Sequence, residues 1–219
     1  DIGITVSAAL DRFERTGDPM AGPTERNTAG NGSIMRLAPV VLWSYPDQDA
    51  SERFAVESSR TTHGTRECLD ACRLMARILG RALDGRRREE VLMADQDTFR
   101  GAEAVEALAH GSYRSKSRSD IRGSGYVVES LEAALWCFNF SESFEEAVLM
   151  AANLGNDADT TAAVTGQVAG AFYGQRGIPT HWLDRLTMRA EIEELALRLI
   201  EGGPRGETDT EDRDDAISP

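Results

Sequence analysis

The sequence predicts an all-α fold in a single globular domain. Three segments, 64–85, 126–138 and 187–201, carry apolar residues at the i, i+3, i+4, i+7 spacing of an amphipathic helix. Alternating runs of apolar and polar residues, which predict strands, are absent from the sequence. A chain of 219 residues is long enough to bury one substantial core. We therefore expect helices that pack ridges into grooves around that core.

Weaker copies of the same pattern bring the expected total to about ten helices. The further candidate segments are 3–15, 33–44, 50–61, 87–98, 101–112, 143–153 and 159–174. The last of these is unusual because it is rich in small residues, including Ala162, Gly166, Ala169 and Gly170. Since glycine lowers helix stability, we expect close packing to compensate and this helix to lie at the centre of the domain.

Three stretches interrupt the helical pattern. Residues 17–33 are rich in Gly, Pro and Asn and predict a loop, as do residues 113–125, which are mainly basic and polar. Residues 202–219 are acidic and nearly devoid of apolar side chains, a composition typical of disorder. We therefore expect a helical domain over 1–201 and a disordered acidic tail over 202–219.

The overall charge limits the classes of partner. The net charge of −13 argues against nonspecific binding to DNA or to an anionic membrane, both of which favour a basic surface. No run of 18 apolar residues and no signal-like N-terminus is present. The three cysteines have the pattern of buried thiols in a reducing compartment. We expect a cytoplasmic protein without nucleic-acid or membrane partners.

The segment NLGNDADTT at 153–161 has two interpretations. Asp157, Asp159 and Thr160 all offer oxygen ligands suited to a hard cation such as Mg²⁺ or Mn²⁺. Alternatively, Asp159 or Thr160 caps the following helix and Asp157 favours the positive end of its dipole. The segment alone does not decide between a metal site and a helix cap.

Two other polar stretches precede predicted helices. The turn GNGS at 30–33 exposes backbone N–H groups that suit an anion, although Ser33 could instead cap the helix. His63, between two predicted helices, could donate to a phosphate or ribose oxygen, or serve as a capping or packed histidine.

A fourth stretch, GSGY at 123–126, stands before a strongly amphipathic helix. Tyr126 could stack on a base or a sugar, or bridge core and solvent. Taken together, the four stretches offer oxygen ligands, anion-binding amides, a histidine and a tyrosine. A ligand with phosphate and sugar groups, bound with a divalent cation, would use all of them.

The sequence resembles the ADP-ribosylglycohydrolase family, which includes the dinitrogenase-reductase-activating glycohydrolases. The motifs GNGSIMRLAPV, THGTRECLDA, GYVVESLEAALWCF and NLGNDADTTAAVTGQVAGAFYG carry the resemblance, in the family's order, over about residues 1–200. It implies an all-α, multihelical bundle of orthogonal type. It also implies hydrolysis of the glycosidic bond that joins ADP-ribose to a protein side chain or small acceptor, at a two-metal Mg²⁺ or Mn²⁺ centre.

The resemblance also implies roles for individual residues. Asp157, Asp159 and Thr160 match the family's C-terminal metal ligands, and the two aspartates are the expected catalytic residues. The loop that cradles the phosphates and ribose of ADP-ribose is matched by Asn31, Gly32, Ser33 and Met35. His63 matches a histidine near the ligand, and the adenosine side is matched by Gly125 and Tyr126.

One family motif has no counterpart in this sequence. The remaining metal ligands of the family lie in an N-terminal Thr/Ser-Asp-Asp motif, and no such motif precedes Asp157. The chain also starts, at Asp1, almost directly in an apolar-periodic segment. We therefore expect a domain that lacks the family's first helices, and an apolar groove that a second copy or another partner would cover.

Three hypotheses follow. The first is an enzyme that acts on ADP-ribosylated proteins or small molecules. The second is a catalytically impaired module or pseudoenzyme that still binds ADP-ribose, because the N-terminal metal ligands are absent. The third is a structural protein without a ligand, which the retained GNDADT motif disfavours.

Overall fold

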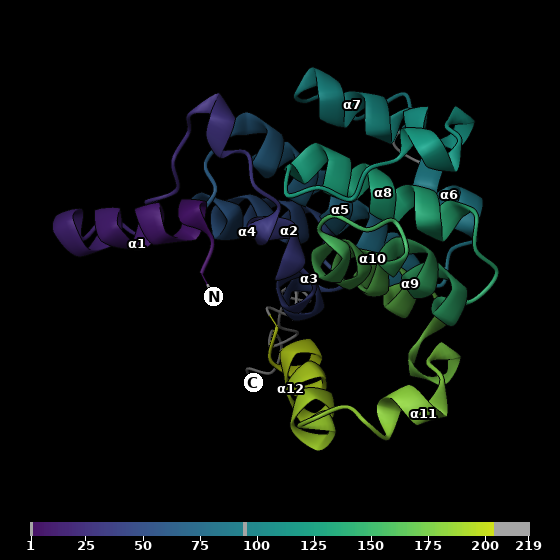
Figure 1. Ribbon diagram of the computed structural model, residues 1–219. Coiled ribbons are helices and arrows are strands. Elements are labelled where there is room, and N and C mark those ends of the chain that lie inside the picture. Colours follow the sequence, from purple (N-terminus) through teal and green to yellow (C-terminus); the bar gives the residue numbers. More distant parts are fainter. Residues whose placement is uncertain (1, 94–95, 204–219) are drawn as a thin grey trace, which may run out of the picture.

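The computed structural model describes residues 2–93 and 96–203 and confirms the all-α fold (Figure 1). Within these ranges the chain forms twelve α-helices and four short 3₁₀ helices and has no β-strand. The α-helices are α1 (Ile4–Thr16), α2 (Gly32–Met35), α3 (Ala38–Ser44), α4 (Gln48–Arg60), α5 (Arg66–Leu83), α6 (Arg88–Met93), α7 (Glu103–Ala109), α8 (Val127–Asn139), α9 (Phe144–Ala152), α10 (Ala158–Tyr173), α11 (Thr180–Leu183) and α12 (Arg189–Gly202). The 3₁₀ helices span Arg26–Thr28, Ser112–Ser115, Arg118–Asp120 and Gln175–Gly177.

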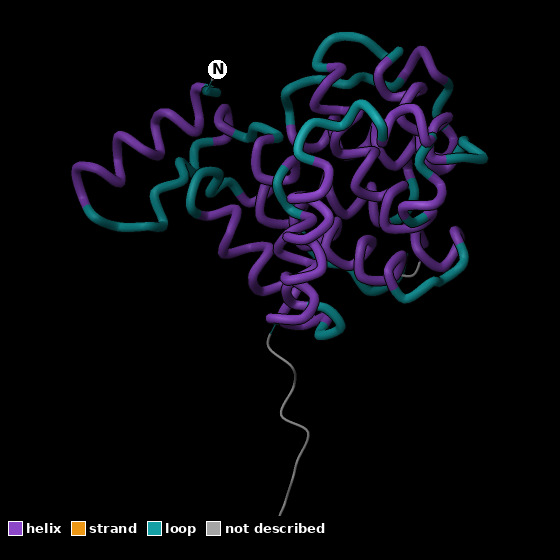
Figure 2. Tube along the Cα trace, turned by 90° about the horizontal axis from the view of Figure 1, so that it is seen from below, coloured by secondary structure: helices purple, strands orange, loops and turns teal. Residues whose placement is uncertain are grey.

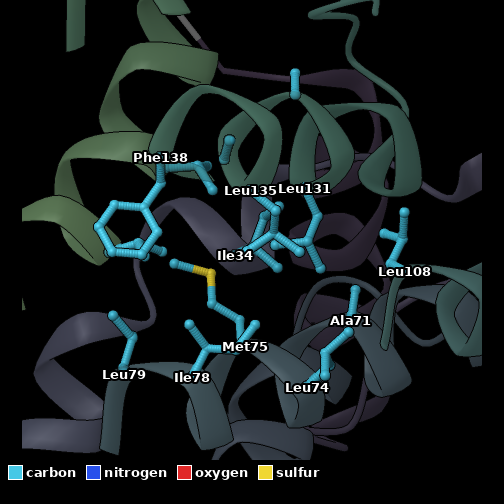
Figure 3. Close-up of a cluster of buried hydrophobic side chains, with 14 of the residues drawn as sticks. Ile34, Ala71, Leu74, Met75, Ile78, Leu79, Leu108, Leu131, Leu135 and Phe138 are labelled. Carbon is cyan, nitrogen blue, oxygen red and sulfur yellow. The ribbon is translucent and has the colours of Figure 1, made fainter. Parts of the chain in front are cut away.

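The core lies between α5, α8 and α10. Helix α5 begins where the Thr65 hydroxyl accepts a hydrogen bond from the Cys68 amide, and it then buries one long apolar face. Helix α8 is buried along almost its whole length. Figure 3 shows how Met75 of α5 reaches between Ile34 of α2 and the side chains of α8. Burial of this apolar face is the main source of stability.

Helix α10 occupies the centre of the domain, as its small residues predict. It packs against α8, α9, α5 and α2. A Cβ atom added to Gly166 would lie 3.9 Å from the Val148 side chain, and one added to Gly170 would lie 3.8 Å from the Phe144 ring. A Cβ atom at either position would therefore make only an ordinary van der Waals contact with α9, so these distances do not require glycine there.

The single helix predicted over 33–44 is wrong in one respect, because the chain forms two helices there. Pro39 has no N–H to donate to Met35, and its ring excludes a continuous helix. Helix α2 therefore ends at Met35 and α3 begins at Ala38. Gln167 of α10 joins the two halves: its Nε2 donates to the carbonyl oxygens of Ile34 (3.0 Å) and Met35 (3.1 Å), and its Oε1 accepts from the Ala38 amide (2.8 Å).

Other boundaries differ by smaller amounts. The helix predicted over 87–98 ends at Met93, and residues 96–98 form a turn. The short helix α11 was not predicted. The loop predicted over 113–125 contains two 3₁₀ helices. The predicted disordered tail lies, from residue 204 onward, outside the described residues.

Two apolar surfaces remain at the periphery. Helix α1 extends away from the body of the molecule (Figures 1 and 2), and Ala9 is its only buried residue. On another side, α3, α10, α11 and α12 line an apolar cavity of about 600 Å³, named the α12 groove below. Over the described residues, no helix is long and apolar enough to cross a membrane.

Candidate functional site

The stretches singled out in the sequence come together at the N-terminal ends of helices α2, α5, α8 and α10. The loop before α2 pairs with the loop before α8 through an isolated antiparallel bridge between Gly30 and Tyr126. On one side of this bridge the Asn31 amide donates to the Gly125 carbonyl (3.0 Å). On the other side the Val127 amide donates to the Ala29 carbonyl (3.0 Å). Two loops about a hundred residues apart are thus held edge to edge.

Asp157 joins this pair of loops from the start of α10. Its backbone amide donates to the Gly123 carbonyl (2.9 Å), and its carboxylate oxygen Oδ2 accepts from Nδ2 of Asn31 (2.7 Å). A Cβ atom at Gly123 would lie 2.5 Å from the Thr161 hydroxyl oxygen, so only glycine allows this close approach. The aspartate is therefore fixed against both neighbouring loops.

The helix-cap prediction is wrong for both residues it named, because α10 begins at Ala158 and Asp159 and Thr160 lie inside its first turn. The N-cap residue is Asp157, whose side chain accepts no capping hydrogen bond from the helix amides. The Thr161 hydroxyl instead donates to the Asp157 carbonyl (2.8 Å). Because the Asp157 carboxylate faces Asn31 and not the helix end, its position reflects contacts outside α10.

The oxygen donors near Asp157 fit a hard divalent cation in kind. Asp157 is half-buried, Asp159 is exposed in the first turn of α10, and Thr160 beside it is buried. Carboxylate and hydroxyl oxygens are the donors that Mg²⁺ and Mn²⁺ prefer. Among the described residues, however, no group of three or more His, Cys, Asp or Glu side chains forms a site. The described donors therefore fit part of a coordination sphere.

His63 lies beneath the turn at residues 30–33, named the glycine loop below, and is almost completely buried. A Cβ atom at Gly32 would lie 2.8 Å from Cε1 of its ring, so the loop passes directly over the imidazole. Nδ1 of His63 lies 2.8 Å from the Thr62 hydroxyl, which also accepts from Arg36 (2.6 Å). Burial, assisted by the Arg36 charge, lowers the pKa of His63 to about 4. At neutral pH the imidazole is therefore uncharged.

Tyr126 is half-buried at the entrance of α8. Burial and a hydrogen bond with Glu67 of α5 raise the pKa of Tyr126 to about 12, so the phenol keeps its proton at neutral pH. The Ser124 hydroxyl accepts from the Tyr126 amide (3.2 Å) and donates to Glu129. The ring therefore lies on a loop that is hydrogen-bonded on both sides, next to exposed Gly125.

The remaining predicted site residues lie in α2. Ser33 is buried within that helix, and Asn31 is the N-cap residue, so the alternative prediction of Ser33 as the cap is wrong. Met35 stands at the end of α2 with its side chain 41% exposed. Its amide donates to the Asn31 carbonyl (3.3 Å), which connects Met35 to the loop before α2.

Several residues of this region were not predicted from the sequence. Arg36 and Thr62 set the hydrogen bonding of His63, and Glu67 and Ser124 set that of Tyr126. Thr62 and Ser124 are near His63 and Tyr126 in sequence, whereas Arg36 and Glu67 come from other elements and no spacing rule connects them to the site. The histidine's neighbour Thr62 carried the one available signal, a hydroxyl adjacent to a buried imidazole.

The predicted basic loop is largely neutralised. Arg114 pairs with Glu89 (2.8 Å), and Lys116 pairs with Glu132 (2.7 Å). Arg118 donates to the carbonyl of Asn153 (2.6 Å). Asn153 is the first residue of the loop 153–157 between α9 and α10, named the aspartate loop below. These side chains therefore act mainly within the fold.

Comparison with known proteins identifies the relatives of this architecture. A profile of the ADP-ribosylglycohydrolase family matches residues 1–208. The sequence is 40% identical over 205 residues to the ADP-ribosylarginine hydrolase Tri1 of Pseudomonas putida, covering 94% of this chain and 55% of that relative. It is 29% identical over 195 residues to the ADP-ribosyl-[dinitrogen reductase] glycohydrolase of Rhodospirillum rubrum, covering 88% of this chain and 62% of that relative.

A solved structure gives the same relationship. It is described as an ADP-ribosylglycohydrolase-related protein complex and superposes with a TM-score of 0.82 at 40% sequence identity. The match covers 91% of this chain and 69% of that one. The chain spans a little over half the length of the two curated relatives named above, with 55% and 62% of them covered.

Proposed function

Because this chain belongs to the ADP-ribosylglycohydrolase family, we propose that the protein hydrolyses the glycosidic bond between ADP-ribose and a modified protein side chain or small acceptor. The observation that carries the proposal is the hydrogen bond between Asn31 and Asp157, 126 residues apart, which joins the glycine loop to the aspartate loop. The oxygen donors at the start of α10 thereby lie beside the amides of the first turn of α2. A diphosphate-containing ligand needs both kinds of group.

The first substrate to test is ADP-ribose linked to arginine. Two relatives, from Pseudomonas putida and Serratia proteamaculans, are named ADP-ribosylarginine hydrolases and are 40% and 37% identical to this chain. Other relatives carry different substrate names and are less similar, such as the Rhodospirillum rubrum protein at 29% identity. The order of similarity therefore favours arginine as the acceptor.

In this proposal each loop has a separate role in binding ADP-ribose. The backbone of Asn31, Gly32 and Ser33 at the start of α2 holds the phosphates, with Met35 and neutral His63 beside the ribose. Gly125 and Tyr126 line the adenosine side, where the ring offers a face for stacking while its hydroxyl is hydrogen-bonded to Glu67. His63 supports the glycine loop from below, since its ring lies against Gly32.

We further propose that catalysis depends on Mg²⁺ or Mn²⁺, in the two-metal arrangement that the resemblance implies. Asp157, Asp159 and Thr160 would supply part of the ligand set, and Asp157 and Asp159 would act in catalysis. When bound, the cations would orient the ribose hydroxyls and activate a water molecule. The chain's own contribution is to hold the Asp157 carboxylate still through its contacts with Asn31 and Gly123.

Calorimetry tests the binding part of the proposal directly. ADP-ribose is titrated into the protein with and without Mg²⁺, and then into the variants Asp159→Ala and Asp11→Ala. Both aspartates are exposed, but Asp11 lies on α1, so it controls for a general change of charge. We expect Asp159→Ala to weaken the Mg²⁺-dependent binding at least tenfold and Asp11→Ala to leave it unchanged. Equal affinities in all three proteins would contradict the metal assignment.

A binding module without turnover is the second candidate. It is favoured because the described residues near the aspartate loop supply too few carboxylates for a complete set of metal ligands. Incubation with arginine-ADP-ribosylated protein separates the two candidates. Release of free ADP-ribose supports the hydrolase, and tight ADP-ribose binding with no release supports the module.

We also propose a cytoplasmic protein that associates with a second copy of itself. The three cysteines, Cys68, Cys72 and Cys137, are free and buried, as expected of a reducing compartment. Among the described residues, the amphipathic helix α1 has one buried side chain, Ala9, and the α12 groove is apolar. A helix in a groove is a common mode of association. ADP-ribosylated proteins would be its transient partners.

A further inference from the structure

The hydrogen bonds of the Asn31 side chain leave it no donor for a ligand. The residue is 8% exposed. Its Nδ2 lies 2.7 Å from Asp157 Oδ2, 3.2 Å from the Ser124 carbonyl oxygen and 3.4 Å from the Ser130 hydroxyl oxygen. An amide nitrogen carries two hydrogens, and these three acceptors use both of them.

The orientation of this amide follows from its neighbours. A carboxylate oxygen and a carbonyl oxygen are acceptors only. If the amide were turned by 180°, its own oxygen would face both of them and both contacts would become repulsive. The nitrogen therefore points at Asp157 and Ser124.

We propose that Asn31 is a positioning residue, whose side chain holds the Asp157 carboxylate in place for a divalent cation instead of contacting ADP-ribose. This inference rests on the proposed function and refines it, since the resemblance alone assigns Asn31 to the ligand-binding loop. Its backbone remains part of the glycine loop. Its side chain acts on the cation through Asp157.

The geometry explains how one side chain can do this. Asn31 bonds to the aspartate loop through Asp157 and to the loop before α8 through both Ser124 and Gly125. The bond to Asp157 occupies Oδ2, and within the described residues no hydrogen bond reaches Oδ1. One carboxylate oxygen is thus held while the other stays available. Outer hydrogen-bond partners of this kind commonly change metal affinity ten- to a hundredfold.

The test compares Asn31→Ala with Gln167→Ala. Gln167 is a matched control because its amide also makes three hydrogen bonds between separate segments, with no contact to Asp157. Mn²⁺ affinity of the full chain is measured by electron paramagnetic resonance, and backbone amide exchange is measured around Asp157. Urea denaturation supplies the stability of each variant.

We expect Asn31→Ala to weaken Mn²⁺ binding at least tenfold and to speed exchange of the Asp157 amide, which bonds to Gly123. We expect Gln167→Ala to lose comparable stability yet keep Mn²⁺ affinity within twofold. If both variants lose affinity in proportion to their stability, Asn31 has only a structural role and the inference is overturned.

The proposed function and the inference fail in different ways. Absence of Mn²⁺ binding by the wild-type chain contradicts the metal assignment and with it the role of Asn31 toward a cation. Wild-type Mn²⁺ binding that is unchanged in Asn31→Ala overturns the inference alone. Unchanged exchange at Asp157 in Asn31→Ala overturns the positioning role even if the wild-type chain binds Mn²⁺. Faster exchange confined to residues near Asp157, absent from Gln167→Ala, supports it.

Discussion

The charge state of His63 is set by its burial between a polar contact and the glycine loop. Nδ1 lies 2.8 Å from the Thr62 hydroxyl, which also accepts a hydrogen bond from Arg36. Nε2 is the ring nitrogen that lies near Gly30 and Gly32. Burial and the nearby Arg36 charge lower the pKa of His63 to about 4, so the ring is uncharged at neutral pH. The histidine thus presents a neutral ring beneath the glycine loop.

This burial makes stability depend on pH. The pKa of His63 is about 4 in the folded protein and 6.5 when unperturbed, so between these values the unfolded chain binds the proton and the native state does not. Stability is therefore lost as pH falls through this window. Relative to pH 7, we expect wild-type protein at pH 5 to lose about 2 kcal/mol more than His63→Gln. Urea denaturation of both proteins at the two pH values measures this difference, and equal losses would contradict a buried neutral imidazole.

At the scale of elements, hydrophobic periodicity predicts the long helices but misses the break between α2 and α3. The amphipathic pattern predicts α5 and α8 because their apolar residues pack into the core. It also predicts α12, whose apolar residues line the α12 groove without being buried. It misses the break between α2 and α3 because the apolar positions continue across Pro39. The backbone carbonyls and the amide left without a helical partner at that break bond to Gln167, more than a hundred residues later in the sequence. No local sequence rule relates the break to Gln167.

Removal of Gln167 tests whether this interaction stabilises the break. Gln167→Ala leaves the carbonyls of Ile34 and Met35 and the amide of Ala38 without this partner, so we expect a loss of about 1–3 kcal/mol in the free energy of unfolding. The control is Gln175→Ala, which removes an exposed hydrogen bond to Glu193. That variant should change stability by less than about 0.5 kcal/mol. Similar denaturation midpoints for both variants would show that water replaces Gln167 at the break.

The candidate site combines a predictable part with an unpredictable one. Helix-starting loops that contain glycine and polar residues are visible in the sequence, and the motif order indicated that Asn31, Tyr126 and Asp157 belong together. The particular contacts were not visible. Whether the Asp157 carboxylate caps α10 or faces Asn31 depends on its rotation, and that rotation is set by a loop distant in sequence.

At the scale of the whole molecule, two apolar surfaces have no partner within the described residues. On α1, Val6, Leu10 and Phe13 recur at the spacing of one helix face, and Leu10 and Phe13 are 47% and 46% exposed. In the α12 groove, Ile192 and Leu197 are 47% and 61% exposed. Exposed apolar surface of this extent favours association.

Charge substitutions test whether two copies associate through a specific contact between α1 and the α12 groove or through nonspecific apolar contacts. If α1 of one copy enters the α12 groove of another, Leu10→Glu and Ile192→Glu should each convert a dimer to a monomer in sedimentation velocity experiments, because a carboxylate in an apolar contact is costly. Leu149→Glu is the matched control, since Leu149 on α9 is similarly exposed (44%) and lies outside both surfaces. A monomeric wild-type chain at micromolar concentration, or a dimer that persists in both variants, would rule out this mode of pairing. A dimer lost in both and retained in Leu149→Glu would assign the contact to α1 and the α12 groove.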